Sequence, residues 1–96
     1  MSAAEAIGVR CRTDGDGWAC EVTVTGGGSP TVHEVSVSTS ELARLAQGDA
    51  TPDDLVRRSF VFLLAREPKE SILRRFALPV IGSYFPEYEA TITRRG

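Results

Sequence analysis

Apolar and polar residues alternate with a period of two in three segments of the N-terminal half: residues 6–12 (AIGVRCR), 18–25 (WACEVTVT) and 32–38 (VHEVSVS). Such alternation, with many β-branched residues, is typical of strands that bury one face. Between the first two segments, Asp14-Gly15-Asp16-Gly17 predicts a tight turn, because glycine tolerates a positive φ angle. The pattern therefore predicts three consecutive antiparallel strands.

A two-residue turn at Gly15-Asp16 also sets the register of the first two strands. Cys11 then faces Cys20 on the apolar face, and Arg10 faces Glu21 on the polar face as a favourable cross-strand ion pair. A slip by one residue would break both patterns, so the two faces support the same register.

The second connection, residues 26–30 (GGGSP), ends in a proline that cannot donate to a strand ladder. We therefore expect pairing to begin with Thr25 opposite Val32, which places Cys20 opposite Val37 and His33 opposite Val24. In this register the apolar residues of all three strands stay on one face of the sheet.

After the third strand the apolar residues take a helical spacing. Ser38-Thr39-Ser40-Glu41 has the form of a capping box and predicts a helix at 39–47, which Gly48 ends. Thr51 and Pro52 suit the first turn of the main helix, at 52–66.

Two further prolines divide the rest of the chain. Pro68 and Pro79 separate two short helices, expected at 69–76 and 79–85. The polar tail at 89–96 is expected to fray. The whole pattern predicts one α+β domain over residues 1–96: a three-stranded antiparallel β-meander followed by three or four short α-helices packed on its apolar face.

The charge and the apolar runs of the sequence bear on which classes of partner and which compartment we expect. A net charge of −2 over 96 residues gives no bulk attraction to nucleic acid, which makes a nucleic-acid partner unlikely on this count. The longest apolar run, residues 60–65, is far too short to span a membrane. The N-terminus lacks a secretory pattern. We therefore expect a cytoplasmic protein with Cys11 and Cys20 reduced.

The cysteine pair allows two interpretations. As direct cross-strand neighbours, Cys11 and Cys20 could form a disulfide and act as a redox switch. The interpretation that we favour is two small apolar core residues. A zinc site with His33 is excluded by the predicted register, since His33 would lie about 13 Å away along the strands.

Catalytic and cofactor motifs are missing from the sequence. His33, the sole histidine, has no nucleophile motif beside it, and we expect a half-exposed strand residue. Asp14 and Asp16 suit a turn better than a calcium loop. Gly26 to Gly28 lacks the lysine of a phosphate-binding loop and is interpreted as a spacer. We expect no enzyme activity, no cofactor and no metal.

The aromatic and apolar residues of 60–88 are more numerous than one helix layer over a small sheet requires. They either complete the core or leave an exposed patch that a protein partner, or a second copy of the chain, covers. The neighbouring arginine pairs could meet an acidic partner or form an ordinary solvated face. The predicted interaction surface comprises Arg57, Arg58, Arg74, Arg75, Tyr84, Phe85 and Tyr88.

Two resemblances bear on function. The run LVRRSFVFLLAREPKESILRRFALPVIGSYFPEY resembles the C-terminal half of a group of short bacterial proteins without an assigned function, and this implies no activity and no site residues. More weakly, the order of strand 32–38 and the two helices after it resembles a dimeric ribbon-helix-helix DNA-binding unit. Glu34 on the outward face of that strand would meet the negative field of DNA. We therefore prefer the hypothesis of a non-enzymatic protein-interaction module, and keep the DNA-binding unit as the alternative.

Overall fold

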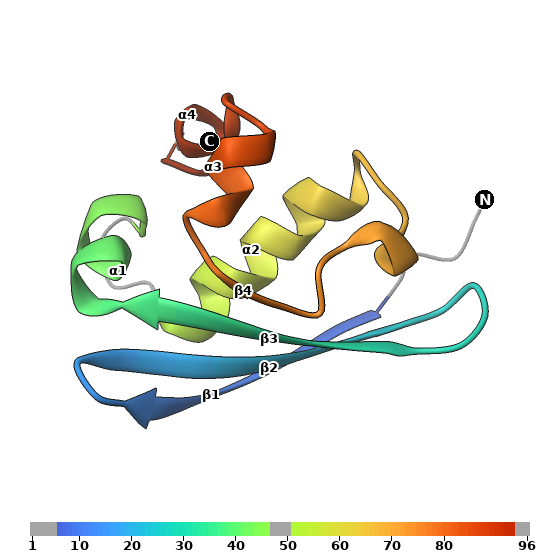
Figure 1. The fold of residues 1–96 in the computed structure, drawn as a ribbon, viewed down its shortest axis with the longest axis horizontal. Coiled ribbons are helices and arrows are strands. Elements are labelled where there is room, and N and C mark those ends of the chain that lie inside the picture. Colours follow the sequence, from blue (N-terminus) through green and yellow to red (C-terminus); the bar gives the residue numbers. More distant parts are fainter. Residues whose placement is uncertain (1–5, 47–50, 94–96) are drawn as a thin grey trace.

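The structure, a computed structural model, describes residues 6–46 and 51–93. It confirms the α+β class: a four-stranded sheet in the order β1-β2-β3-β4 carries helices packed against it (Figure 1). Within the described residues, no helix has the length and apolar character needed to cross a membrane. The elements are β1 Ala6–Asp14, β2 Gly17–Thr25, β3 Thr31–Ser38, α1 Thr39–Leu45, α2 Pro52–Leu64, a 3-10 turn Lys69–Ser71, β4 Arg75–Ala77, α3 Val80–Tyr84 and α4 Tyr88–Thr93.

The predicted register of the first hairpin is confirmed. Cys11 faces Cys20, and Arg10 faces Glu21 across an ion pair of 3.5 Å. Gly15 takes a positive φ of 61° in the turn, which explains the glycine there. The alternating pattern and the turn chemistry agree on this register.

The predicted register of β2 and β3 is wrong by two residues. Cys20 faces Val35 instead of Val37, and His33 faces Val22. Because the shift is even, the apolar side chains keep their face. Gly17 helps to fix the observed register at the other end of β2. A Cβ atom at position 17 would lie only 2.1 Å from the carbonyl oxygen of Val37 in β3, so the close approach of the two strands requires glycine.

The helix predicted at 69–76 is also wrong. The chain forms one 3-10 turn after Pro68 and then β4, which pairs parallel to β3. The Glu34 amide donates to the Arg74 carbonyl at 2.7 Å, and the Leu78 amide donates to the Ser36 carbonyl at 3.0 Å. These bonds satisfy backbone groups on the second edge of β3, which would otherwise lie open.

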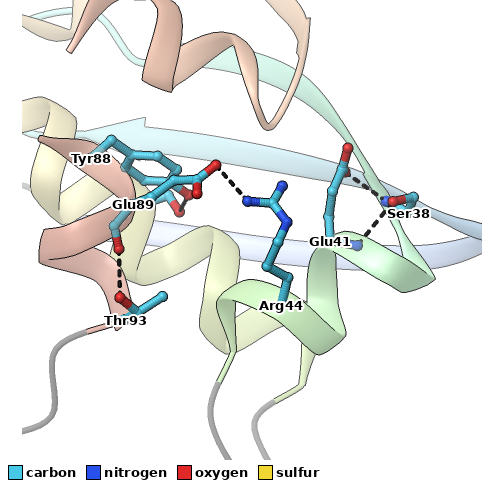
Figure 2. A network of polar contacts seen from close by, with 7 residues as sticks. Ser38, Glu41, Arg44, Tyr88, Glu89 and Thr93 are labelled. Carbon is cyan, nitrogen blue, oxygen red and sulfur yellow. Dashed lines mark hydrogen bonds and ion pairs between the residues drawn. The ribbon is translucent and has the colours of Figure 1, made fainter. Parts of the chain in front are cut away.

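The predicted helix at 79–85 is present as α3, and the main helix ends at Leu64, two residues early. The capping box of α1 is present, since Ser38 and Glu41 exchange side-chain bonds with each other's amides (Figure 2). The end predicted for this helix, at residue 47 and Gly48, lies outside the described residues.

The tail does not fray as predicted, at least as far as Thr93, because it forms α4. Tyr88 and Ile92 are buried, and an ion pair of 2.5 Å joins Glu89 to Arg44 of α1 (Figure 2). Bonding to Glu89 raises the pKa of the Arg44 guanidinium further. The last three residues of the predicted tail, 94–96, lie outside the described part.

The core lies between the helices and the inner face of the sheet. Its largest fully buried apolar side chains include Tyr88, Phe60, Leu45, Leu55 and Leu78. Every buried side-chain nitrogen or oxygen atom among the described residues has a hydrogen-bond partner. The surplus of apolar residues in 60–88 goes largely into this core, although Val61, Leu73 and Tyr84 stay exposed.

Cys11 and Cys20 form a disulfide, which corrects the prediction of two thiols. The predicted register already allowed this bond, because it makes the two cysteines direct cross-strand neighbours, and their Cα atoms lie 3.9 Å apart. We predict that reduction lowers the free energy of unfolding by about 2–3 kcal/mol, the loop-closure entropy of a short loop. Urea unfolding followed by Trp18 fluorescence, with and without reductant, measures this. An unchanged midpoint contradicts it, and the Cys11→Ala/Cys20→Ala variant, insensitive to reductant, is the control.

Candidate functional site

An open pocket of about 200 Å³ lies between the end of α2, the segment around β4, and α3. Its volume is below the roughly 300–1,000 Å³ of pockets that hold drug-sized ligands. It suits a single large side chain. The lining is mostly apolar and consists of Leu63, Glu67, Ser71, Ile72, Leu73, Phe76, Val80, Ile81, Tyr84 and Phe85.

One wall of the pocket is the segment that follows Pro68. The carbonyl of Leu73 accepts a hydrogen bond of 2.7 Å from Nδ1 of His33 in β3. The neighbouring carbonyl of Arg74 accepts from the Glu34 amide. These two bonds fix the backbone at the position where the Leu73 side chain, 46% exposed, borders the pocket.

Lys69 fixes the start of the same segment. Its ammonium donates to the carbonyl oxygens of Gly26 at 2.9 Å and Gly27 at 3.3 Å, and pairs with Glu70 at 3.0 Å. Although charged, the lysine is only 2% exposed. The glycine loop, interpreted from the sequence as a spacer, therefore supplies the acceptors for a buried cation.

His33 is fully buried, which corrects the expectation of a half-exposed side chain. Since Nδ1 donates to the Leu73 carbonyl, a neutral ring accepts at Nε2 from the Thr31 hydroxyl, at 2.9 Å. Burial is the main cause that lowers the pKa of His33; the Leu73 bond opposes the shift and the charge of Arg74 adds to it. The ring also lies 5.3 Å from that of Phe60. His33 is thus a neutral structural residue.

Tyr88 does not belong to any surface, which corrects its place in the predicted interaction surface. It is 0% exposed, and its hydroxyl lies 2.6 Å from Oγ of Ser59, which donates to the Leu55 carbonyl. The tyrosine hydroxyl is therefore the donor to Ser59. Burial raises the pKa of Tyr88 to about 12.

The other residues of the predicted surface do not form one site. Tyr84, 66% exposed, and the half-buried Phe85 both line the pocket. Arg57 and Arg58 are exposed on α2, and Arg58 donates to the Ile92 carbonyl at 2.6 Å. Neither contributes to the lining of the pocket.

Arg74 and Arg75 line a separate depression, together with charged residues of the outer face of the sheet. Arg75 and Arg12 both pair with Glu34, at 3.7 and 3.6 Å. Charges of both signs alternate on this exposed face, and such pairs contribute little binding energy or stability. This face has no single sign of charge that would select a partner.

Sequence reasoning missed the residues that make the pocket wall, above all Leu73 and Glu67. Leu73 was predicted to lie in the helix at 69–76, and Glu67 was given no role. The signal that could have found them is the alternation of Ile72, Arg74 and Phe76, which fits an extended strand as well as a short helix.

The polar groups in the pocket lining are Glu67, Ser71 and the Tyr84 hydroxyl, which supply no nucleophile and base pair. Across residues 6–46 and 51–93, no three side chains of His, Cys, Asp or Glu gather as metal ligands. What the arrangement can do is hold an apolar group beside a carboxylate.

No protein-family model, no curated protein and no solved structure matches this chain.

Proposed function

We propose that this chain is a non-enzymatic protein-interaction module that receives one apolar side chain of a partner in the pocket beside α3. The observation that carries the proposal is the pocket itself, with Leu73 and Tyr84 exposed at its border. Burying exposed apolar surface drives association, and anchor side chains in such pockets dominate binding energies.

The proposal places the module in the cytoplasm. A reducing compartment of this kind would open the Cys11–Cys20 disulfide of the structure. The module would then act without the stabilisation of about 2–3 kcal/mol that we expect from the disulfide.

A DNA-binding ribbon-helix-helix unit is not supported. In such a unit the strand before the two helices pairs with the same strand of a second subunit. Here that strand is β3, and it is hydrogen-bonded to β2 on one edge and to β4 on the other. β4 covers residues 34–36, the middle of the second edge, so neither edge of β3 is free along its length for a partner strand. We do not carry this alternative further.

The test is selection of peptides from a phage-displayed library of random 12-residue sequences against the whole chain. We expect enriched peptides with one large apolar anchor. Leu73→Asp should weaken them at least about tenfold, because a carboxylate would be buried against the anchor. Val61→Asp is the matched control, since Val61 is 57% exposed on α2, outside the pocket.

Binding that survives Leu73→Asp, or falls equally in the control, contradicts the proposal. The fold of both variants is checked by circular dichroism. Light scattering of the chain alone covers the second partner class, because a dimer that Leu73→Asp dissociates would identify a second copy as the occupant.

A further inference from the structure

The charges around the pocket are unevenly compensated. Three glutamates follow α2 or lie close to its end: Glu67, Glu70 and Glu87. Glu70 pairs with Lys69 at 3.0 Å, and Glu87 pairs with Arg66 at 3.1 Å. Bonding to Lys69 is the main cause that lowers the pKa of Glu70. The pKa of Glu87 is lowered first by a hydrogen bond to its own backbone and then by the bond to Arg66. Glu67 is the member that lines the pocket, and it has no ion pair or side-chain hydrogen bond within the described part of the chain.

The end of α2 adds to the negative potential at Glu67. A helix C-terminus carries about half a negative charge on its last carbonyl groups. The last turn of α2 contains no basic residue. The Leu63 carbonyl in this turn accepts the amides of Arg66 and Glu67 at 2.9 Å, so the Glu67 backbone is held against the helix end.

The nearby basic groups face elsewhere. The Arg66 guanidinium lies 3.6 Å from the centre of the Phe62 ring and donates to the Phe62 carbonyl and to Glu87. The Lys69 ammonium is bound to the glycine loop. Arg74 and Arg75 line the separate depression on the outer face of the sheet. Among residues 6–46 and 51–93, the mouth of the pocket therefore has a carboxylate and no cation that pairs with it.

On the basis of the proposed function, we infer that the partner is a peptide segment whose apolar anchor is accompanied by an adjacent lysine or arginine, which pairs with Glu67. A partner that covered Glu67 without a cation would leave a carboxylate partly desolvated and unpaired, which weakens binding. An acidic segment would be repelled outright. The carboxylate thus selects basic segments, while the pocket supplies the affinity.

The same display library tests this inference. We expect the enriched peptides to carry Lys or Arg within about four residues of the anchor, the reach of one helical turn. Glu67→Gln should weaken a synthetic, fluorescein-labelled copy of the best peptide about three- to tenfold, and Glu67→Lys by more. Selection against Glu67→Lys should shift enrichment toward Asp and Glu. Glu21→Gln, on the outer face of the sheet, changes net charge equally and is the matched control.

The outcomes distinguish this inference from the proposed function. Anchored peptides without basic residues, bound equally by Glu67→Gln and abolished by Leu73→Asp, overturn this inference and keep the proposed function. Basic peptides that Glu21→Gln weakens as much as Glu67→Gln also overturn it, because the attraction is then to net charge. Failure to enrich any apolar anchor overturns both claims.

Discussion

Replacing Tyr88 by alanine is expected to lower the free energy of unfolding by about 3–5 kcal/mol, the usual cost of removing a large aromatic side chain from a core. Tyr88 is fully buried, and its ring packs edge-on against that of Phe62, with centroids 5.3 Å apart. Its hydroxyl also donates to Ser59 of α2. The substitution removes a buried contact that holds α4 against α2.

Urea unfolding followed by the fluorescence of Trp18, the single tryptophan, measures this loss. Tyr84→Ala is the control, since it removes the same side chain from a position that is 66% exposed, and we expect a change within about 0.5 kcal/mol. Equal losses in the two variants would falsify the assignment of Tyr88 to the core.

Because Tyr88 is buried, we also expect the free energy of unfolding to fall at alkaline pH. Its pKa is raised to about 12 in the folded protein by burial, while the unfolded chain releases the proton near pH 10. The folded state therefore keeps a proton that the unfolded state loses. The contribution of the protonated Tyr88 hydroxyl to the free energy of unfolding is fully present below pH 10. It is lost as the pH rises from 10 to 12. Tyr88→Phe should remove this part of the pH dependence.

Replacing Lys69 by alanine is the second large effect, and we expect a loss of about 3–5 kcal/mol of unfolding free energy, from lost hydrogen bonds and a cavity together. The variant leaves the carbonyl oxygens of Gly26 and Gly27 without their buried donor and empties the space of the aliphatic chain. Lys69→Met refills that space without the charge, and should cost only the hydrogen bonds, about 1.5–3 kcal/mol.

Urea unfolding again gives the values, and Arg57→Ala, which shortens an exposed basic side chain of α2, is the control with an expected change within about 0.5 kcal/mol. A Lys69→Ala variant as stable as Arg57→Ala contradicts the role assigned to the lysine. Lys69→Met separates the contribution of the ammonium from that of packing.

The elements that local rules determine were predictable from the sequence. The first hairpin follows from alternation plus a glycine turn, and α1 and α2 follow from their capping residues, all of which the structure contains. In these cases the signal and the interaction lie within a few residues of one another.

The misassigned parts depend on contacts between distant residues. The segment of β4 was predicted as part of a helix at 69–76, between Pro68 and Pro79. The open edge of β3, about forty residues earlier, makes a strand favourable there instead. Tyr88 was placed on the surface because a tyrosine near a polar tail gives no sign of Ser59, its partner 29 residues away. The pocket wall includes residues of the first misassigned segment, Ile72, Leu73 and Phe76, so it could not be predicted.

The buried lysine has a consequence for the chemistry of the whole surface. Lys69 is the only lysine in the sequence. Because its ammonium lies beneath the glycine loop, the folded chain presents no lysine side chain to reagents in solution. Acylation or cross-linking at an ε-amine would then require the turn Lys69–Ser71 to leave its place. The rate at which Lys69 reacts with an amine-specific label therefore measures how often the turn Lys69–Ser71, part of the pocket wall, opens.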